Sequence, residues 1–235
     1  MTFRRTFPAV LLFSVAAIGC SQSEGNEAEA EGMDSAVAAG QVYPNTPAEM
    51  VFSNDHVTVQ RLGGEAGVWT GEHSHEGNQL AVVLSGGTQT VREGGEETEV
   101  VYEDGQAFWV EATEGHDHMT SDPINAVLIT LSGMSHGMGA AQAYPNAEAG
   151  VVFENERVVV QRLDMEPNVW AGEHSHAGNQ MVVVLKGGTT TYREGDEMRD
   201  ETRAAGESFW IEAVEAHDHA NTSEEAGAAL LITMK

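Results

Sequence analysis

The chain of 235 residues repeats itself. Residues 41–118 align with residues 142–219 at an offset of 101 positions without a gap, and 44 of the 78 aligned pairs are identical. A repeat of this length is too long for one unit of a solenoid and indicates a duplicated domain. We therefore expect one domain at residues 41–131 and a second at residues 142–235. The Gly- and Met-rich segment 132–141 is expected to link them.

Both copies are composed of short segments with the pattern of β-strands. Glycine-containing turns separate these segments, and no window of twelve or more residues has a capped helical period. The copies differ at every position from Glu97 to Asp104, as expected of an exposed hairpin. The sequence thus predicts an all-β fold of two antiparallel sandwiches or barrels. In the first copy the predicted strands are 56–62, 80–84, 88–92, 107–110 and 126–131.

The first twenty residues have the pattern of an export signal. Arg4 and Arg5 precede an apolar run that is too short to cross a membrane as a mature helix. The run closes on Ala17-Ile18-Gly19-Cys20, which resembles the lipobox of bacterial lipoproteins, and Arg4-Arg5-Thr6-Phe7 weakly resembles a twin-arginine signal. We expect Cys20 to be lipidated, although a buried structural thiol is the alternative. Because Cys20 is the only cysteine, no disulfide can form within the chain.

Residues 21–40 are rich in Glu, Ala, Gly and Ser and have no apolar period, which predicts a flexible acidic tether. The protein would then be exported and held at the cell envelope, on the periplasmic or outer-surface side. Its formal net charge is −26, with 11 Lys and Arg against 37 Asp and Glu. Such a surface repels nucleic acid and anionic lipid, so Cys20 would be the only membrane contact.

A pair of histidines stands in the middle of each copy. His73 and His75 are two residues apart, so on a strand both side chains point to the same face. Gln79 keeps the same parity if the strand geometry persists. Paired imidazoles on a rigid strand are a common way to hold a transition metal. The second copy repeats the pattern with His174, His176 and Gln180.

Two ordered motifs in each copy resemble the two signatures of the cupin superfamily, over nearly all of residues 41–235. Gln79 stands where the family usually has Glu, Glu111 and Thr113 replace the usual Pro and Gly, and Asn168 replaces a glycine. In the first copy the motifs contain Gly67, His73, His75, Gln79 and Gly86, then Gly105, Glu111, Thr113 and His116. The second copy has Gly206, Glu212, Val214, His217 and Asn221 at the corresponding positions of the second motif.

The resemblance implies a bicupin: two jelly-roll barrels, each with one divalent transition metal inside. Its ligands would be His73, His75 and His116 with Gln79, and His174, His176 and His217 with Gln180. Either the glutamine coordinates through its neutral oxygen, or each site is a three-histidine site with open positions. Among Fe, Zn, Ni, Cu and Mn, three neutral imidazoles suit the first four better than Mn.

Two further pairs are candidates for acid–base chemistry. His118 and His219 each lie two residues beyond a proposed ligand and face the same way, so they suit proton transfer in the pocket or support of a ligand. Alternatively, they lie where the strand leaves the barrel. Glu111 and Glu212 are expected at the barrel mouth and are candidates for a general base.

The leading hypothesis is an exported, lipid-anchored metalloenzyme that performs dioxygenase-like oxidation of a small organic substrate. A metal-dependent isomerase, decarboxylase or lyase is the nearest alternative. A periplasmic protein that binds metal or ligand without turnover is a second, since both copies keep every proposed ligand. A third alternative is a barrel in which the metal only stabilises the fold. Independently of these alternatives, the chain could form a homo-oligomer.

Overall fold

The computed structural model describes residues 40–132 and 139–235. The predicted signal peptide, Cys20, nearly all of the acidic tether and most of the 132–141 linker lie outside the described residues. Among the described residues, no helix has the length and apolar character needed to cross a membrane.

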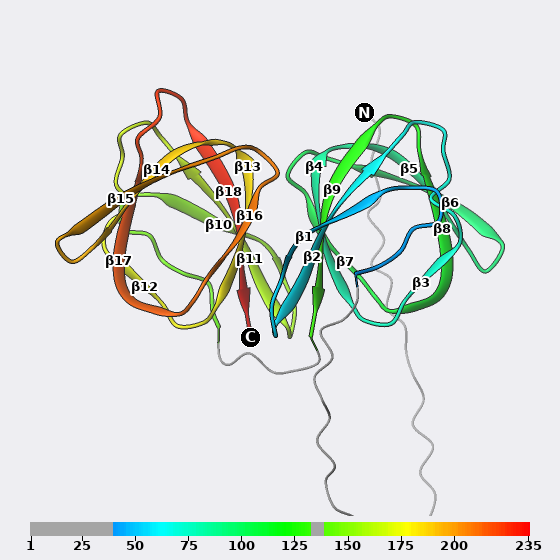
Figure 1. Ribbon diagram of the computed structural model, residues 1–235, viewed down its shortest axis with the longest axis horizontal. Helices are drawn as coiled ribbons and strands as arrows, with labels where there is room; N and C mark the ends of the chain where they lie inside the picture. The colour runs from blue at the N-terminus through cyan, green and yellow to red at the C-terminus, as the bar shows by residue number, and fades with distance from the viewer. Residues whose placement is uncertain (1–39, 133–138) are drawn as a thin grey trace, which may run out of the picture. The chain divides into compact units, whose positions relative to one another are not determined.

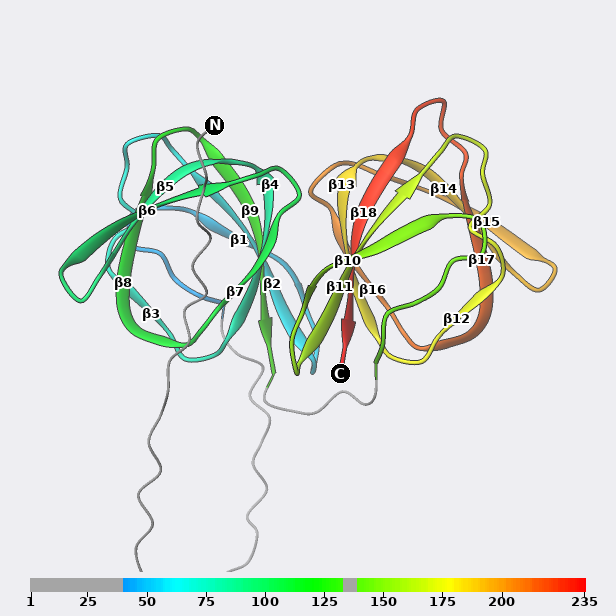
Figure 2. The same cartoon turned by 180° about the vertical axis from the view of Figure 1, so that it is seen from behind.

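The first domain is a sandwich of two antiparallel sheets (Figure 1; Figure 2). Its five-stranded sheet has the order β1-β2-β9-β4-β7, and its four-stranded sheet has the order β3-β8-β5-β6. The strands are β1 (Ala48–Ser53), β2 (Val57–Gly64), β3 (His73–His75), β4 (Gln79–Ser85), β5 (Gly87–Glu93), β6 (Glu96–Tyr102), β7 (Ala107–Val110), β8 (Thr113–Thr120) and β9 (Ile124–Leu131).

The second domain repeats this topology strand by strand. Its sheets have the orders β10-β11-β18-β13-β16 and β12-β17-β14-β15, so the predicted all-β fold of two similar domains is confirmed. The strands are β10 (Glu148–Glu154), β11 (Val158–Met165), β12 (His174–His176), β13 (Gln180–Lys186), β14 (Gly188–Glu194), β15 (Glu197–Arg203), β16 (Ser208–Ile211), β17 (Val214–Asn221) and β18 (Gly227–Met234).

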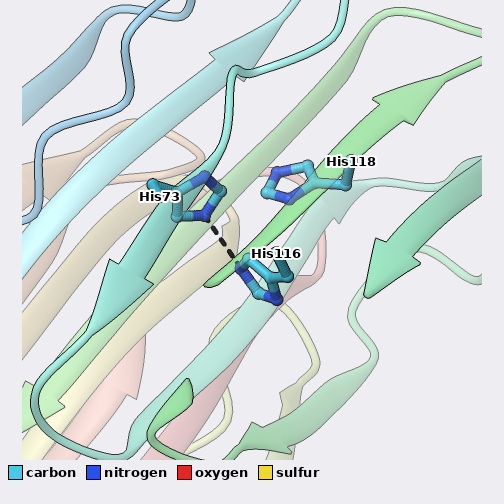
Figure 3. Close-up of side chains that lie close together, drawn as sticks. All are labelled: His73, His116 and His118. Carbon is cyan, nitrogen blue, oxygen red and sulfur yellow. Dashed lines mark hydrogen bonds between the residues drawn. The ribbon is translucent and has the colours of Figure 1, made fainter. Parts of the chain in front are cut away.

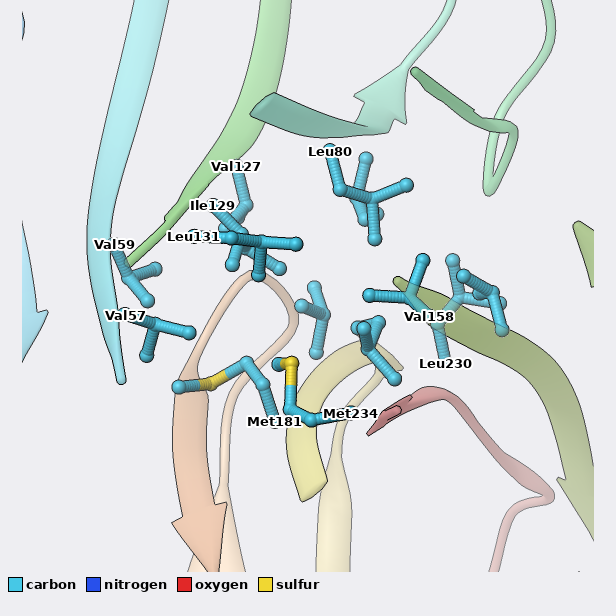
Figure 4. Packing of buried hydrophobic residues seen from close by; sticks show 14 residues of the cluster. Val57, Val59, Leu80, Val127, Ile129, Leu131, Val158, Met181, Leu230 and Met234 are labelled. Atoms are coloured by element: carbon cyan, nitrogen blue, oxygen red, sulfur yellow. The ribbon is translucent and has the colours of Figure 1, made fainter. Parts of the chain in front are cut away.

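Strand β4 is continuously apolar because both of its faces are buried. Ala81 points into the interior of its own sandwich, where it packs with Tyr43, Leu62 and Leu128. Leu80 and Val82 point the other way, into a cluster to which both domains contribute (Figure 4). We call this cluster the shared core; its fourteen buried residues are Val57, Val59, Leu80, Val82, Val127, Ile129, Leu131, Val158, Val160, Met181, Val183, Leu230, Ile232 and Met234.

Aromatic pairs at equivalent positions border the shared core. Trp109 of the first domain stacks on Phe153 of the second, and Phe52 of the first stacks on Trp210 of the second, each with ring centroids 6.4 Å apart. Each pair therefore joins one position of the repeat to a different position of the other copy. This reciprocity is the contact pattern of a twofold-symmetric dimer, here built within one chain.

Sequence pattern missed three strands of the first domain: β1, β6 and β8. β6 is exposed along most of its length, so it has no buried face to impose an apolar alternation, although the exposed hairpin predicted around Glu97 is present. β8 carries polar residues on its inner face, because that face holds His116 and His118. Histidines stand at the inward positions where a half-buried strand usually has apolar residues, so a periodicity analysis cannot recognise β8.

The shared core gives a prediction about stability. Leu80 is fully buried, and Leu80→Ala should lower the free energy of unfolding by about 2–5 kcal/mol, because it removes apolar contact and leaves a cavity. Val101→Ala is the matched control: this side chain is 70% exposed, so we expect a change within about 0.5 kcal/mol. Urea unfolding followed by tryptophan fluorescence measures both, and equal midpoints for the two variants would contradict the assigned core.

Candidate metal centre

Strand pairing brings the histidines of the first motif next to the histidine of the second motif. β3 and β8 are antiparallel neighbours, and His73 lies directly opposite His116 although 43 residues separate them. Their Nε2 atoms are 2.8 Å apart (Figure 3). In the second domain His174 lies opposite His217 on β12 and β17, also with 2.8 Å between the Nε2 atoms.

The second histidine of each pair joins the same cluster. The His75 ring centroid lies 5.2 Å from that of His73 and 4.7 Å from that of His116. In the second domain the Nε2 atom of His176 is 3.1 Å from that of His217. Both nitrogens of His75 are buried without a hydrogen-bond partner among the described residues. Unpartnered buried polar atoms are costly, and a bound cation is one way to satisfy them.

His118 and His219 belong to the cluster as well. One nitrogen each of His73, His116 and His118 lie within 4.8 Å of one another, and His174, His217 and His219 form the equivalent group. Figure 3 shows His118 turned towards His73 and His116. The structure therefore places these residues in the pocket, and not where the strand leaves the barrel. Four imidazoles converge in each domain.

The loop before β3 fixes the tautomer and the orientation of the His73 ring. His73 Nδ1 donates a hydrogen bond to the carbonyl oxygen of Gly71 at 2.7 Å, which leaves Nε2 unprotonated and directed at the cluster. The carboxylate of Asp117 in turn accepts hydrogen bonds from the Gly71 amide at 2.9 Å and the Thr70 hydroxyl at 3.0 Å. Gly71 has φ +87°, and a Cβ there would lie 2.8 Å from Pro44, so only glycine fits.

The glutamines are oriented by threonines. Gln79 Nε2 donates to Thr130 Oγ1 at 3.0 Å, and Gln180 Nε2 donates to Thr233 Oγ1 at 2.8 Å. With the amide nitrogen engaged, each Oε1 is buried, and the side chain interacts further with the phenol of Tyr43 or Tyr144. A fixed amide whose buried oxygen lines the same cavity as the imidazoles suits coordination through that oxygen.

Tyr43 and Tyr144 are site residues that sequence reasoning missed. The Tyr43 ring centroid lies 4.6 Å from that of His73, and Tyr144 has the same distance to His174. Burial raises the pKa of both phenols, so they remain protonated. Tyr-Pro-Asn is identical in the two copies, but this identity does not indicate that the tyrosine lies beside the histidines.

The cluster imidazoles are uncharged at neutral pH. Burial, and then the neighbouring imidazoles His116 and His73, lower the pKa of His75 to about 4. The same causes, burial first, lower the pKa of His118 to about 3 and that of His219 to about 3. Burial also lowers the pKa of His73 despite its hydrogen bond to Gly71. A neutral imidazole keeps the lone pair that a metal requires.

The nitrogen geometry fits a single ion. Two nitrogens each about 2.1 Å from an ion are about 3.0 Å apart at a right angle and about 3.4 Å apart at the tetrahedral angle. The observed Nε2 separations of 2.8 and 3.1 Å are close to the first value. The converging imidazoles, the unpartnered nitrogens of His75 and the buried oxygens of Gln79 and Gln180 together fit a divalent transition metal in each domain.

The two glutamates that are candidates for a general base lie at exposed positions, and each lines a cavity together with at least one cluster histidine. Both Glu111 and Glu212 are exposed. Glu111 is among the residues lining the first domain's cavity, whereas Glu212 Oε1 accepts a hydrogen bond from Trp210 Nε1 at 2.9 Å. Neither carboxylate belongs to a metal-ligand group in the described residues.

Comparison with known proteins agrees with this fold. The family model described as Cupin domain matches residues 161–233. AerE from Microcystis aeruginosa superposes with a TM-score of 0.62 at 12% identity, covering 82% of this chain and 93% of that chain. Oxalate decarboxylase from Lactobacillus farciminis, in a formate complex, gives 0.58 at 11% identity with 76% of each chain covered. The oxalate decarboxylase from Bacillus subtilis, described with Mn(II) centres, gives 0.58 at 10% identity, covering 85% of this chain and 79% of that chain. No curated protein matches the sequence.

Metal content tests the ligand assignment. His75→Ala should remove about half of the bound metal, because it damages one of two sites, and His75→Ala combined with His176→Ala should remove nearly all of it. Elemental analysis of the purified variants gives the number of ions per chain. His56→Ala is the control, since His56 stacks on Trp210 and lies outside both clusters. Unchanged metal content in the double variant would show that the ligands are assigned wrongly.

The lowered pKa values predict how the metal-free protein responds to acid. The pKa values of His75 and His176 are lowered to about 4 and about 3 in the folded protein. Below pH 6.5 these histidines are protonated in the unfolded chain but not in the folded protein, so the unfolded state binds more protons. The free energy of unfolding should therefore be highest above pH 6.5 and decrease as the pH falls towards 4. The His75→Asn, His176→Asn double variant should have a shallower slope in this range. The carboxylates titrate in both proteins, so parallel slopes would contradict the assignment.

Proposed function

Because the protein consists of two cupin domains, each with a buried cluster of uncharged imidazoles, we propose that it is a metal-dependent enzyme that oxidises a small organic molecule with dioxygen. One observation supports this proposal above all: imidazole nitrogens from separate strands converge at 2.8–3.1 Å beside a cavity. The glutamine in each cluster adds a neutral oxygen, so the donor set carries no negative charge.

Each domain would hold one ion through its paired histidines, the facing histidine and the glutamine oxygen. A bound divalent ion supplies Lewis acidity and a path for electrons. Imidazole donors suit Fe better than Mn. The residues of the chain would position the substrate, exclude water and keep the imidazoles uncharged.

The proposed reaction is balanced without a further reductant. Dioxygen is the oxidant, both of its oxygen atoms enter the product, and the four electrons that reduce it come from the organic substrate. His118, with a pKa lowered to about 3 by burial, is uncharged at neutral pH, so one ring nitrogen carries a hydrogen and the other has a free lone pair. It therefore suits accepting a hydrogen bond or a metal ion at that nitrogen better than acting as a general acid.

Non-redox chemistry is the second candidate, and the similarity of fold to oxalate decarboxylases is the observation that favours it. The residues lining the first domain's cavity include no lysine or arginine that would bind a small carboxylate, whereas those lining the second domain's cavity include Lys186 and Arg203. We further propose that the enzyme works at the cell envelope, held by a lipidated Cys20, on a small diffusible substrate.

Oxygen dependence separates the candidates. Protein loaded with Fe(II) should consume dioxygen in a 1:1 ratio with a neutral organic substrate, and ¹⁸O₂ should label the product with two atoms. His75→Ala with His176→Ala should lower the rate by at least about 100-fold, because the metal is lost. Equal turnover under anaerobic conditions would replace the oxidative proposal with a non-redox one. Absence of turnover in both conditions, with metal bound, would favour a binding protein.

A further inference from the structure

The two clusters have the same ligands but different charged neighbours. In the first domain Arg92 stands between two carboxylates, because it lies opposite Glu97 on β6 and opposite Asp117 on β8. Its guanidinium donates a hydrogen bond to Glu97 Oε1 at 2.7 Å. Asp117 is hydrogen-bonded instead by neutral groups, the Thr70 hydroxyl and the Gly71 amide, so its negative charge is not paired with the guanidinium.

One exchange redirects the equivalent arginine of the second domain. Met198 stands at the position of Glu97, so Arg193 faces an uncharged residue on β15. Its guanidinium donates to Asp218 Oδ2 at 2.7 Å, while Asp218 Oδ1 still accepts from the Gly172 amide at 2.9 Å. The Asp218 side chain is only 5% exposed, so solvent screens this ion pair less than a surface pair. The guanidinium therefore offsets the charge of the supporting aspartate.

A second carboxylate differs in the same way. Glu93 lies opposite His116, and its Oε1 accepts a hydrogen bond from the neutral Thr113 hydroxyl at 2.8 Å. In the second domain the equivalent Glu194 lies 3.6 Å from the guanidinium of Arg199. Both carboxylates of the second domain thus have an arginine where those of the first domain have a hydroxyl group.

The charge balance around the two clusters differs as a result. At seven aligned positions on β5, β6 and β8, the first domain has one arginine and three carboxylates. The second domain has three arginines and three carboxylates at the corresponding positions of β14, β15 and β17. The positions are 92, 93, 97, 98, 100, 102 and 117, each with its counterpart 101 residues later. The first cluster therefore has a more negative surrounding than the second.

These charges reach the imidazoles. Burial lowers the pKa of His116, and two carboxylates, Glu93 and Asp117, oppose this shift. Burial lowers the pKa of His217 to about 4, and there one carboxylate opposes the shift whereas Arg199 adds to it. A positive neighbour that disfavours a proton on an imidazole also disfavours a metal cation bound to that imidazole.

We propose that the two metal sites are unequal: the first domain binds a divalent cation more tightly, and Arg193 and Arg199 weaken the site of the second domain by offsetting its carboxylates. When metal is limiting, the ion occupies the first domain, which then carries the proposed oxidation. Glu97 and its counterpart Met198 contribute to the difference, because they determine which carboxylate the neighbouring arginine bonds. This inference rests on the proposed metal function.

The experiment measures each site alone in the full, metal-free chain, with Zn²⁺ as a redox-inert probe and isothermal titration calorimetry as the measurement. His174→Ala with His176→Ala leaves only the first site intact. His73→Ala with His75→Ala leaves only the second. We expect the first site to bind Zn²⁺ at least about tenfold more tightly, which is the size of effect that groups behind the ligands have on metal affinity.

Two further variants test the cause. In the chain that keeps the second site, Arg193→Gln should strengthen Zn²⁺ binding about three- to tenfold, because the charge of Asp218 is no longer offset. In the chain that keeps the first site, Glu97→Met should weaken binding by a similar factor, because the arginine opposite then bonds Asp117. Glu99→Met is the matched control, since it removes the same charge from the same exposed strand, and it should change the affinity less than about twofold.

The outcomes separate this inference from the proposed function. Equal affinities at the two sites, or tighter binding at the second, would overturn the inference and leave the metal sites standing. Weaker binding in Arg193→Gln would also overturn it, because the arginine would then only hold Asp218 in place. If that variant does not fold, as judged by its melting temperature, Arg199→Gln gives the same test at Glu194. Failure of both chains to bind Zn²⁺ would instead remove the proposed function.

Discussion

The antiparallel pairing of β3 with β8, and of β12 with β17, is the constraint on which the sites depend. It sets His73 opposite His116 and His174 opposite His217, and a slip of one residue would turn one histidine to the other face of the sheet. The register is held from outside the cluster. Asp117 binds the Gly71 loop, and that loop binds Nδ1 of His73, so the strand and the tautomer are fixed together.

Collecting four imidazoles in a buried pocket has a free-energy cost that packing must offset. Burial removes water from the imidazoles, which disfavours their charged form and lowers their pKa values. The offset comes from β4 and β13, which bury both faces. One face packs inside its own sandwich and the other in the shared core. Because the two domains contribute to one core, each supports the scaffold on which the other's site is built.

The duplicated scaffold shows which positions are free to vary. The histidines, the glutamine, the tyrosine and the supporting aspartate are identical in both copies. Wall positions such as Val91 and Tyr192 differ, and they contact the cavity instead of the shared core. A change there alters the size of the cavity without removing contacts that hold the domains together.

The sequence by itself determined the duplication, the all-β class and the common face of the two histidines in each His-x-His pair. The repeat at an offset of 101 and the His-x-His pairs were sufficient for this, because period-two geometry assigns side chains to faces. Five strands of the first copy were recognised with bounds within about two residues of those observed. β8 was missed because histidines occupy the face on which a pattern search expects apolar residues.

Only the tertiary structure decided that His118 joins the cluster, that Tyr43 packs against His73 and that Glu111 lines the cavity from an exposed position. Local periodicity states which way a side chain points. It contains no information about which distant strand lies opposite or how much space the side chains of several strands leave between them, because those depend on how the sheets pack.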